Sequence, residues 1–348
     1  MELSGPCQAH VADDILRRTF PLDEFDDSGW PEVQVPGHWR DQEDFANADG
    51  PMLYRTRFEV DPPGPDRRIW LEFDGVFYQG DVWLDGRYVG DTEGYFFSHH
   101  LEVTDRLRQR HDHLLAVEVA CPPGPSAGGG RSLTGVTTQQ GWNPGGIWRP
   151  VALRETGPVA LRNLRVVCTH ATSTVATLAV RAVVDTARPQ PVVFRTTVLG
   201  IDHRHPRSLA AGENSLEWRV RVPRPPLWWP RELGDQPLFE LRFTVSTDDG
   251  AVSDSAIRRT GFRSVRMRDH VWRVNGERLY LRGAIVPPLL QNLASVDEGS
   301  ATADLHLARE LGLNLLRVAG HVSHPILYEV ADRMGMLIWQ DMPLSGTY

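Results

Sequence analysis

The spacing of apolar residues changes once along this chain of 348 residues, close to residue 260. Before that point, apolar and polar residues alternate in many short runs, as in residues 53–60. Beyond it, short apolar runs take turns with segments such as residues 300–311, in which apolar residues recur every three or four positions. A period of two predicts half-buried strands, and the longer period predicts amphipathic helices. The chain therefore combines a long all-β part with a shorter part in which strands and helices alternate.

Residues 1–157 carry the signals of a first β-sandwich domain. Strands are predicted at 53–60, 69–73, 76–84 and 114–119. The dipeptides Asp74-Gly75 and Asp85-Gly86 favour positive φ angles, so we expect both to close hairpins. A Pro- and Gly-rich stretch at 121–131 predicts an exposed loop.

Residues 158–259 repeat the alternation without a helical segment. In residues 216–222 and 239–245 every second residue is apolar, and the residues between them are charged or polar. Asp249-Gly250 supplies another hairpin turn. About a hundred residues of this kind fit an immunoglobulin-like β-sandwich, although the Cys–Trp–Cys pattern of true immunoglobulin domains is missing.

Residues 260–348 change to a β/α pattern. Strands are predicted at 281–286, 313–318 and 336–339, and helices at 300–311 and from Ser323 to Met334. Gly312 and Gly335 are placed to end the helices, Ser323 to cap the second helix, and Pro325 lies in its first turn. This order demands a parallel sheet with right-handed crossovers. Because a closed eight-stranded barrel needs about 250 residues, we expect only the first part of a (β/α)8 TIM barrel, incomplete, with about three strands and two helices.

Composition and termini exclude several classes of protein. The 37 basic residues, all arginine, stand against 45 acidic ones, and a net charge of −8 gives no basic surface for nucleic acid. The cysteines Cys7, Cys121 and Cys168 lie far apart, which excludes a disulfide framework or a zinc ribbon. We find neither a signal peptide at the start nor an apolar run of about 18 residues, so we expect no membrane span and a cytoplasmic protein.

No cofactor or metal is predicted. Gly128–Ser132 lacks the lysine and the strand-to-helix context of a phosphate-binding loop. His321 and His324 have no third ligand nearby, so we expect helix capping or solvent exposure there. The pairs His99-His100, His111/His113 and His203/His205 stand among polar residues and are expected at the surface.

The order of several motifs resembles glycoside hydrolase family 2, which includes β-galactosidases, β-glucuronidases and β-mannosidases. The first domain carries Gly75-Val76-Phe77-Tyr78, Asp81-Val82-Trp83-Leu84-Asp85-Gly86, Gly94-Tyr95-Phe96 and Gly146-Ile147-Trp148-Arg149-Pro150. The last part carries Gly261-Phe262-Arg263, Asn275-Gly276-Glu277, Leu281-Arg282-Gly283, Asn314-Leu315-Leu316-Arg317 and Asp332-Arg333-Met334-Gly335. The resemblance implies a jelly-roll sugar-binding domain, an immunoglobulin-like sandwich and a catalytic barrel.

Within the family, four stretches lean toward the β-mannosidase-like branch. They are Gly141-Trp142-Asn143, Leu227-Trp228-Trp229-Pro230, Arg317-Val318-Ala319-Gly320 and Trp339-Gln340-Asp341. The sequence departs from that branch at Ala284-Ile285-Val286-Pro287 and at His321, both at positions where the sugar would lie. The resemblance implies a retaining exo-β-glycosidase acting on a β-linked glycoside, β-mannosidase- or β-galactosidase-like.

Retaining hydrolysis needs two carboxyl groups about 5 Å apart, and in a barrel they project from the carboxyl ends of the strands. Asp304, Glu310, Glu329 and Asp332 lie on predicted helices, Glu277 lies in a hairpin, and only Asp341 follows a strand. By resemblance, the two catalytic glutamates follow the fourth and seventh strands, so we expect no catalytic residue in this chain and an inactive isolated chain. The same resemblance implies that substrate is bound by Arg317, His321, Trp339, Asp341, Trp142 and Asn143.

Purely structural interpretations of these residues remain open beside the substrate-binding roles. Arg317 alone would be an ion-paired strand residue, and Trp339 fills a core as readily as it stacks on a sugar. A non-catalytic carbohydrate-binding or interaction protein is the alternative function. A further alternative is a split enzyme, in which a C-terminal complementing polypeptide completes the barrel. The sequence does not determine the sugar, the aglycone or the oligomeric state.

Overall fold

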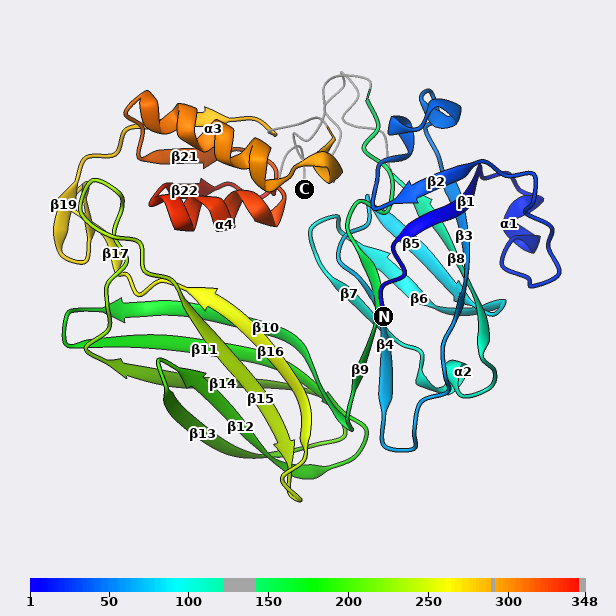
Figure 1. The fold of residues 1–348 in the computed structure, drawn as a ribbon, viewed down its shortest axis with the longest axis horizontal. Coiled ribbons are helices and arrows are strands. Elements are labelled where there is room, and N and C mark those ends of the chain that lie inside the picture. The colour runs from blue at the N-terminus through cyan, green and yellow to red at the C-terminus, as the bar shows by residue number, and fades with distance from the viewer. Residues whose placement is uncertain (122–141, 289–291, 344–348) are drawn as a thin grey trace.

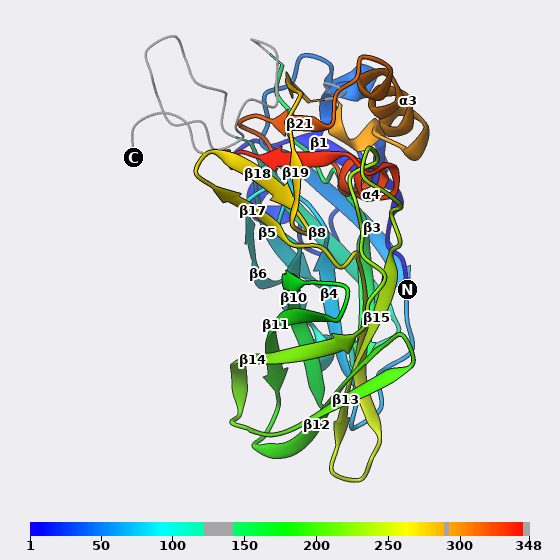
Figure 2. The same cartoon turned by 90° about the vertical axis from the view of Figure 1, so that its left-hand side faces the viewer.

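The computed structural model describes residues 1–121, 142–288 and 292–343. They form a first sandwich (residues 1–156), a second sandwich (159–260), a hairpin sheet (265–279) and a β/α segment (283–340). Figure 1 shows the two sandwiches side by side, with the β/α segment above the second one, and Figure 2 shows the same stack from the side. The expected multidomain β-sandwich architecture is confirmed.

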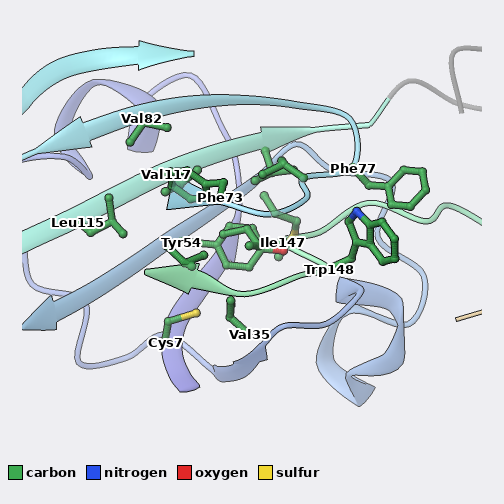
Figure 3. Close-up of a cluster of buried hydrophobic side chains, with 14 of the residues drawn as sticks. Cys7, Val35, Tyr54, Phe73, Phe77, Val82, Leu115, Val117, Ile147 and Trp148 are labelled. Atoms are coloured by element: carbon green, nitrogen blue, oxygen red, sulfur yellow. The ribbon is translucent and has the colours of Figure 1, made fainter. Parts of the chain in front are cut away.

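The first sandwich packs a six-stranded sheet, in the order β2-β1-β3-β8-β5-β6, against a three-stranded sheet, β7-β4-β9. The strands are β1 (Gly5–Val11), β2 (Glu32–Val35), β3 (Met52–Glu59), β4 (Arg68–Phe73), β5 (Gln79–Leu84), β6 (Arg87–Glu93), β7 (His99–Glu102), β8 (Asp112–Ala120) and β9 (Val151–Thr156). Short helices α1 (Leu16–Thr19), η1 (Trp39–Asp41), η2 (Glu43–Phe45) and α2 (Thr104–Leu107) lie in the connections. The core between the sheets includes Tyr54, Phe73, Phe77, Val117 and Trp148 (Figure 3).

One of the two expected hairpins in this sandwich is wrong. Asp85 and Gly86 have φ angles of 53° and 73° and join β5 to β6, as predicted. Asp74-Gly75 instead leads from β4 in one sheet to β5 in the other, and β4 pairs with β7 and β9. Gly75 is needed there for space, because a Cβ atom would lie 2.5 Å from Trp148 Nε1.

The face of β3 that the alternation predicts to be exposed is covered near the start of the strand. In the half-buried strand predicted over residues 53–60, polar residues such as Arg55 would face solvent. Arg55 is nevertheless only 1% exposed, because the segment between α1 and β2 covers it. Its guanidinium pairs with Asp27 at 2.6 Å and donates to the carbonyl groups of Phe20, Leu22 and Phe25. A buried charge with this many partners is satisfied, so β3 is covered on both faces near its start.

The second sandwich places a three-stranded sheet, β10-β11-β14, on a four-stranded sheet, β13-β12-β15-β16. Its strands are β10 (Val159–Ala171), β11 (Val175–Thr186), β12 (Gln190–Val198), β13 (Ile201–Leu209), β14 (Gly212–Pro223), β15 (Phe239–Thr247) and β16 (Val252–Thr260). Alternate residues of both sheets, such as Val180, Val220 and Val245, fill its core. Seven antiparallel strands in two sheets fit the immunoglobulin-like arrangement, and Gly250 (φ 83°) turns β15 into β16 as expected.

A small antiparallel sheet of β17 (Val265–Arg268), β18 (Val271–Val274) and β19 (Glu277–Leu279) leads into the β/α segment. There the strands β20 (Gly283–Val286), β21 (Leu315–Val318) and β22 (Leu337–Gln340) pair in parallel. They are connected through η3 (Leu293–Ser295), α3 (Glu298–Glu310) and α4 (Pro325–Met334). Apolar residues of both helices cover one face of the sheet, among them Leu305, Leu327 and Val330.

The ends of the two helices follow the sequence with one correction. Gly312 (φ 75°) follows α3 and Gly335 (φ 70°) ends α4, both in the left-handed region. Ser323 does not cap α4. His324 is the N-cap and its Nδ1 accepts from the amide of Ile326, while Pro325 takes the first helical position.

One histidine expected at the surface is buried, and others are half-buried. His113 lies in β8, is 1% exposed and contacts Asp85 Oδ2 at 2.8 Å through Nδ1. His203 and His205 lie in β13 with their Nε2 atoms buried, and His100 in β7 pairs with Glu72. The polar residues next to these histidines in the sequence favoured surface positions, but the histidines lie in strands that are partly covered.

The remaining expectations concern thiols, membranes, metals and loops. All three cysteines are free, and burial raises the pKa of Cys7 to about 12. Among the described residues, no helix is long and apolar enough to cross a membrane. Within the same residues, no cluster of three His, Cys, Asp or Glu side chains can hold a metal. The predicted loop at 122–131, with Gly128–Ser132, and Gly141 lie outside the described residues.

Candidate functional site

The carboxyl ends of β20, β21 and β22 meet at one edge of the parallel sheet, hereafter the carboxyl edge. The register places Ile285, Arg317 and Trp339 side by side across the three strands. These side chains lie on the face opposite the two helices, because their sequence neighbours Leu316, Val318 and Ile338 pack against α3 and α4. Ile285 is 65% and Trp339 46% exposed, so this face of the sheet is open in the structure.

Arg317 and Asp341 form the central polar contact at the carboxyl edge. Arg317 Nε and Nη2 lie 2.8 and 2.6 Å from Asp341 Oδ2. The backbone amide of Asp341 donates to Val318 O at 2.9 Å, which fixes the residue directly beyond β22. The guanidinium carbon lies 6.0 Å from the centroid of Trp339, whose ring makes an edge contact with Trp272 at 6.1 Å. A cation, a carboxylate and an exposed aromatic ring are therefore adjacent.

His321 lies in the loop after β21 but is 1% exposed. Its Nδ1 contacts the carbonyl oxygen of Ala319 at 3.1 Å, and burial lowers its pKa, which favours the neutral imidazole. Gln340 Nε2 donates to His321 O at 2.6 Å, and Tyr328 Oη donates to Gln340 Oε1 at 2.5 Å. These bonds fix the loop against α4 and β22.

The first sandwich positions the same loop from the other side. Tyr95 Oη accepts from the amide of Val322 at 2.6 Å, and Trp148 packs edge-on against His324 at 5.9 Å between ring centroids. His38 Nε2 accepts from the amide of Ala294 at 3.3 Å, and the neighbouring Leu293 lies in the core of the first sandwich. The carboxyl edge is thus built jointly by the β/α segment and the first sandwich.

Trp142 and Asn143 belong to this joint region, but Asn143 points into the sandwich. Its Nδ2 donates to Asp49 O and Cys121 O at 3.2 and 3.4 Å, and its Oδ1 accepts from the amide of Gly145. Trp142 makes an edge contact with His38 at 5.3 Å. The hydrogen-bonding groups of Asn143 are thus used within the first sandwich.

Carboxylates are distributed as the sequence indicates. Asp304 and Glu310 lie on α3, Glu329 and Asp332 on α4, and Glu277 on β19. Within the described ranges, Asp341 alone directly follows one of the three parallel strands. A pair of carboxyl groups about 5 Å apart, as retaining hydrolysis requires, is therefore not formed at the strand ends of the described part of the chain.

Sequence reasoning predicted Arg317, Trp339 and Asp341 as site residues and did not predict the residues that fix the loop around them. Gln340 stands inside the quoted Trp339-Gln340-Asp341 motif, and alternation along the strand turns it to the face opposite Trp339, toward the helices. Tyr328 lies one helical turn into α4, on the side where Gln340 points. Tyr95 stands in the quoted Gly94-Tyr95-Phe96 motif and His38 in no quoted motif, and no local signal pointed to their partners, which lie 227 and 256 residues away.

Comparisons with known proteins show to which family the chain belongs. A family model for the glycosyl hydrolase 2 galactose-binding domain-like domain matches residues 38–127, and the model for glycosyl hydrolases family 2 matches residues 159–263. The chain belongs to glycoside hydrolase family 2. The sequence resemblance is confirmed.

Its curated relatives include glycosidases of different specificity. The exo-β-D-glucosaminidase of Amycolatopsis orientalis is 31% identical over 304 residues, covering 82% of this chain and 28% of the relative. The mannosylglycoprotein endo-β-mannosidase of Lilium longiflorum is 24% identical, covering 81% of this chain and 34% of the relative. The chain thus spans about a third of the length of these relatives.

Solved structures agree along nearly the whole chain. The exo-chitosanase of Amycolatopsis orientalis matches with a TM-score of 0.81 and 25% identity, over 98% of this chain and 43% of that one. The β-D-mannosidase of Dictyoglomus thermophilum matches with a TM-score of 0.77 and 23% identity, over 99% and 47% of the two chains. This family-2 chain therefore shares its fold with less than half of each of these enzymes.

Proposed function

We propose that this chain is the N-terminal part of a retaining exo-β-glycosidase, and that β20, β21 and β22 are the first three strands of its (β/α)8 barrel. Three points support the barrel assignment: the strands are parallel, both crossover helices cover the same face, and the two family-2 models match the residues that precede these strands. In such a barrel the face that carries Arg317 and Trp339 turns inward and the carboxyl edge becomes the substrate side.

The observation that carries the proposal is the Arg317–Asp341 pair beside the exposed ring of Trp339. Sugars offer hydroxyl groups and C–H faces. The carboxylate of Asp341 accepts from a hydroxyl, the guanidinium donates to one, and the indole face packs against the C–H groups. We assign these three side chains to binding and orienting the terminal sugar, with the His321 loop beside them.

The hydrolytic step itself needs a protonated carboxyl group to assist the leaving oxygen and a carboxylate to attack the anomeric carbon. Asp341 is a single carboxylate and is neutralised by Arg317. We therefore assign the catalytic pair to later strands of the barrel, beyond the described residues. The described part contributes substrate orientation, which accelerates a reaction only together with those two groups.

The substrate proposed is the non-reducing end of a β-linked glycoside. The β-mannosidase-like motifs favour a mannoside, and the relatives include enzymes named for glucosamine, mannose and galactose. A panel of methyl β-glycosides of these three sugars distinguishes them, because only the preferred sugar places its hydroxyl groups on both Arg317 and Asp341.

The test uses the purified 348-residue chain and two measurements. Calorimetric titration is expected to show saturable binding of one methyl β-glycoside. That binding is lost in Arg317→Ala and retained in the matched control Arg273→Ala, an exposed arginine of β18. Assays with aryl β-glycosides are expected to show no turnover above a blank. Binding that survives Arg317→Ala contradicts the assigned site, and steady turnover by the pure chain contradicts the assigned position of the catalytic pair.

A further inference from the structure

A polar cavity of about 530 Å³ lies between the two sandwiches, away from the carboxyl edge. Strands β4, β7 and β9 with residues 96–98 form one side, and β10 and β16 form the other. Figure 1 shows β9 running between the two sandwiches into the turn before β10. The volume is in the range of sites for small molecules, about 300–1,000 Å³.

The carboxylates that line this interdomain cavity are already neutralised. Glu72 Oε1 lies 2.5 Å from Arg154 Nε and 2.7 Å from His100 Nδ1. Burial raises the pKa of Glu72, but the bonds from His100 and Arg154 outweigh it and hold the pKa below its ordinary value. Asp74 accepts from Ser98 Oγ at 3.0 Å and lies 3.8 Å from a guanidinium nitrogen of Arg149.

Two guanidinium groups in the cavity have no such carboxylate. Arg162 donates from Nη2 to His100 O at 2.7 Å, and its Nε is buried without a partner. Arg258 donates to the carbonyl oxygens of Leu164 and Ile257. In the part of the chain that the structure describes, neither arginine forms an ion pair. Desolvation lowers the pKa of both guanidinium groups, although the side chain of Arg258 stays exposed and the carboxylates of Asp185 and Glu213 oppose the shift at Arg162.

An aromatic platform and neutral polar groups complete the cavity. Phe97 is 55% exposed, and its ring is supported by Phe96 at 4.3 Å between centroids. Ser98, Asn163 and Ser255 are exposed polar lining residues. An exposed aromatic face suits the C–H face of a sugar ring, and the hydroxyl and amide groups suit its hydroxyls.

We propose that this interdomain cavity binds an acidic sugar, a monosaccharide unit that carries a carboxylate. The carboxylate of the ligand pairs with Arg162 and Arg258, and its ring packs on Phe97. Guanidinium and carboxylate match each other geometrically, and such charge-assisted bonds are the strong ones. The ligand would contact both sandwiches at once, since Arg162 lies on β10 while Phe97 precedes β7.

The experiment titrates the 348-residue chain at low ionic strength with D-glucuronate, D-glucose and inorganic phosphate, because salt screens the contact. Glucuronate is expected to bind one per chain, and glucose about tenfold more weakly or less. Arg162→Gln and Arg258→Gln should each weaken glucuronate about tenfold. Arg258→Gln is the safer variant for folding because its side chain is at the exposed rim. Phe97→Ser should weaken glucuronate and leave phosphate unchanged.

Two control variants test whether glucuronate binds in this cavity and nowhere else on the chain. Arg221→Gln removes an exposed arginine of β14 and should leave glucuronate binding unchanged. Trp339→Ala alters the carboxyl edge and should also leave it unchanged, so a failure of the proposed glycosidase function does not affect this result. Equal binding of glucose and glucuronate, or unchanged glucuronate affinity in Arg258→Gln, overturns the proposal. Phosphate binding as tight as glucuronate, together with no effect of Phe97→Ser, overturns the assignment to a sugar.

Discussion

His38 makes the contact between the first sandwich and the β/α segment sensitive to pH. The ring is 1% exposed; its Nδ1 donates to Pro144 O at 2.5 Å, and its Nε2 accepts from the amide of Ala294 at 3.3 Å. This pair of bonds requires the neutral imidazole, because a protonated Nε2 has no lone pair for the amide. Burial lowers the pKa of His38 to about 4 from an ordinary value of 6.5.

The sign and size of the effect follow from linkage. Between pH 6.5 and 4 the unfolded chain binds a proton at this position and the folded chain does not. The stability contributed by the neutral ring is therefore complete above about pH 6.5 and is lost as the pH falls towards 4. At pH 5 the loss amounts to about 2 kcal/mol for one such group.

Urea unfolding followed by tryptophan fluorescence at pH 7.5 and pH 5 measures this loss. His38→Gln keeps an acceptor for Ala294 without a titrating group, so its free energy of unfolding should fall about 2 kcal/mol less than that of the parent chain over this interval. His111→Gln, at a side chain that is 66% exposed, should fall as much as the parent. Carboxylates and the other histidines titrate in all three chains and cancel in the comparison. An identical pH dependence for His38→Gln and the parent would refute the reasoning.

Three further predictions concern stability and dynamics. Arg55→Leu leaves the carboxylate of Asp27 and three carbonyl groups without their partner, and should lower the free energy of unfolding by about 3 kcal/mol in urea titrations. Arg57→Leu, at a side chain that is 56% exposed, should change this free energy by less than about 0.5 kcal/mol. Gly75→Ala places a Cβ atom against Trp148 and should lower the free energy of unfolding by about 1–3 kcal/mol. Gly29→Ala is its control, because an added Cβ atom there meets no atom within 4 Å. Equal urea midpoints for the two variants would contradict the packing argument. In hydrogen exchange of the 348-residue chain, the amides of β22 should exchange faster than those of β21, because β21 pairs on both sides while β22, among the described residues, pairs only with β21. Equal protection of the two strands would contradict the idea of an open sheet edge.

The fold was predictable where local chemistry decides it. Alternation located β3, β4, β5 and β8 of the first sandwich and β14 and β15 of the second. Gly312 and Gly335 marked helix ends because glycine adopts the left-handed region without strain. Arg55 was placed wrongly because alternation shows which residues share a face but not what covers that face. Asp74-Gly75 was wrongly predicted to close a hairpin, because the sequence does not distinguish a Gly required by a turn from a Gly required for space beside the indole of Trp148.

The candidate site was likewise predictable from the sequence only in part. The resemblance to the family predicted Arg317, Trp339 and Asp341 as substrate-binding residues, and the rule that functional groups lie at the carboxyl ends of parallel strands singled out Asp341 among the carboxylates. The groups that hold the neighbouring loop come from distant segments, so neither spacing nor periodicity identified them. The interdomain cavity was also missed, because Arg162 on β10 and Arg258 on β16 lie far apart in the chain. The packing of the two sheets of the second sandwich brings them together, and Phe97 comes from the first sandwich.

These contacts give the first sandwich a role in the geometry of the carboxyl edge. Val322 lies in the loop after β21 and Ala294 in η3, and the amide of each finds its acceptor in the first sandwich, at Tyr95 Oη and His38 Nε2. A buried amide without an acceptor costs about 1–3 kcal/mol, so separating the two parts leaves the loop that carries His321 without one of its supports. Under the proposed function, Tyr95→Phe should therefore change the affinity for the methyl β-glycoside in calorimetric titration, although it removes no side chain assigned to sugar binding.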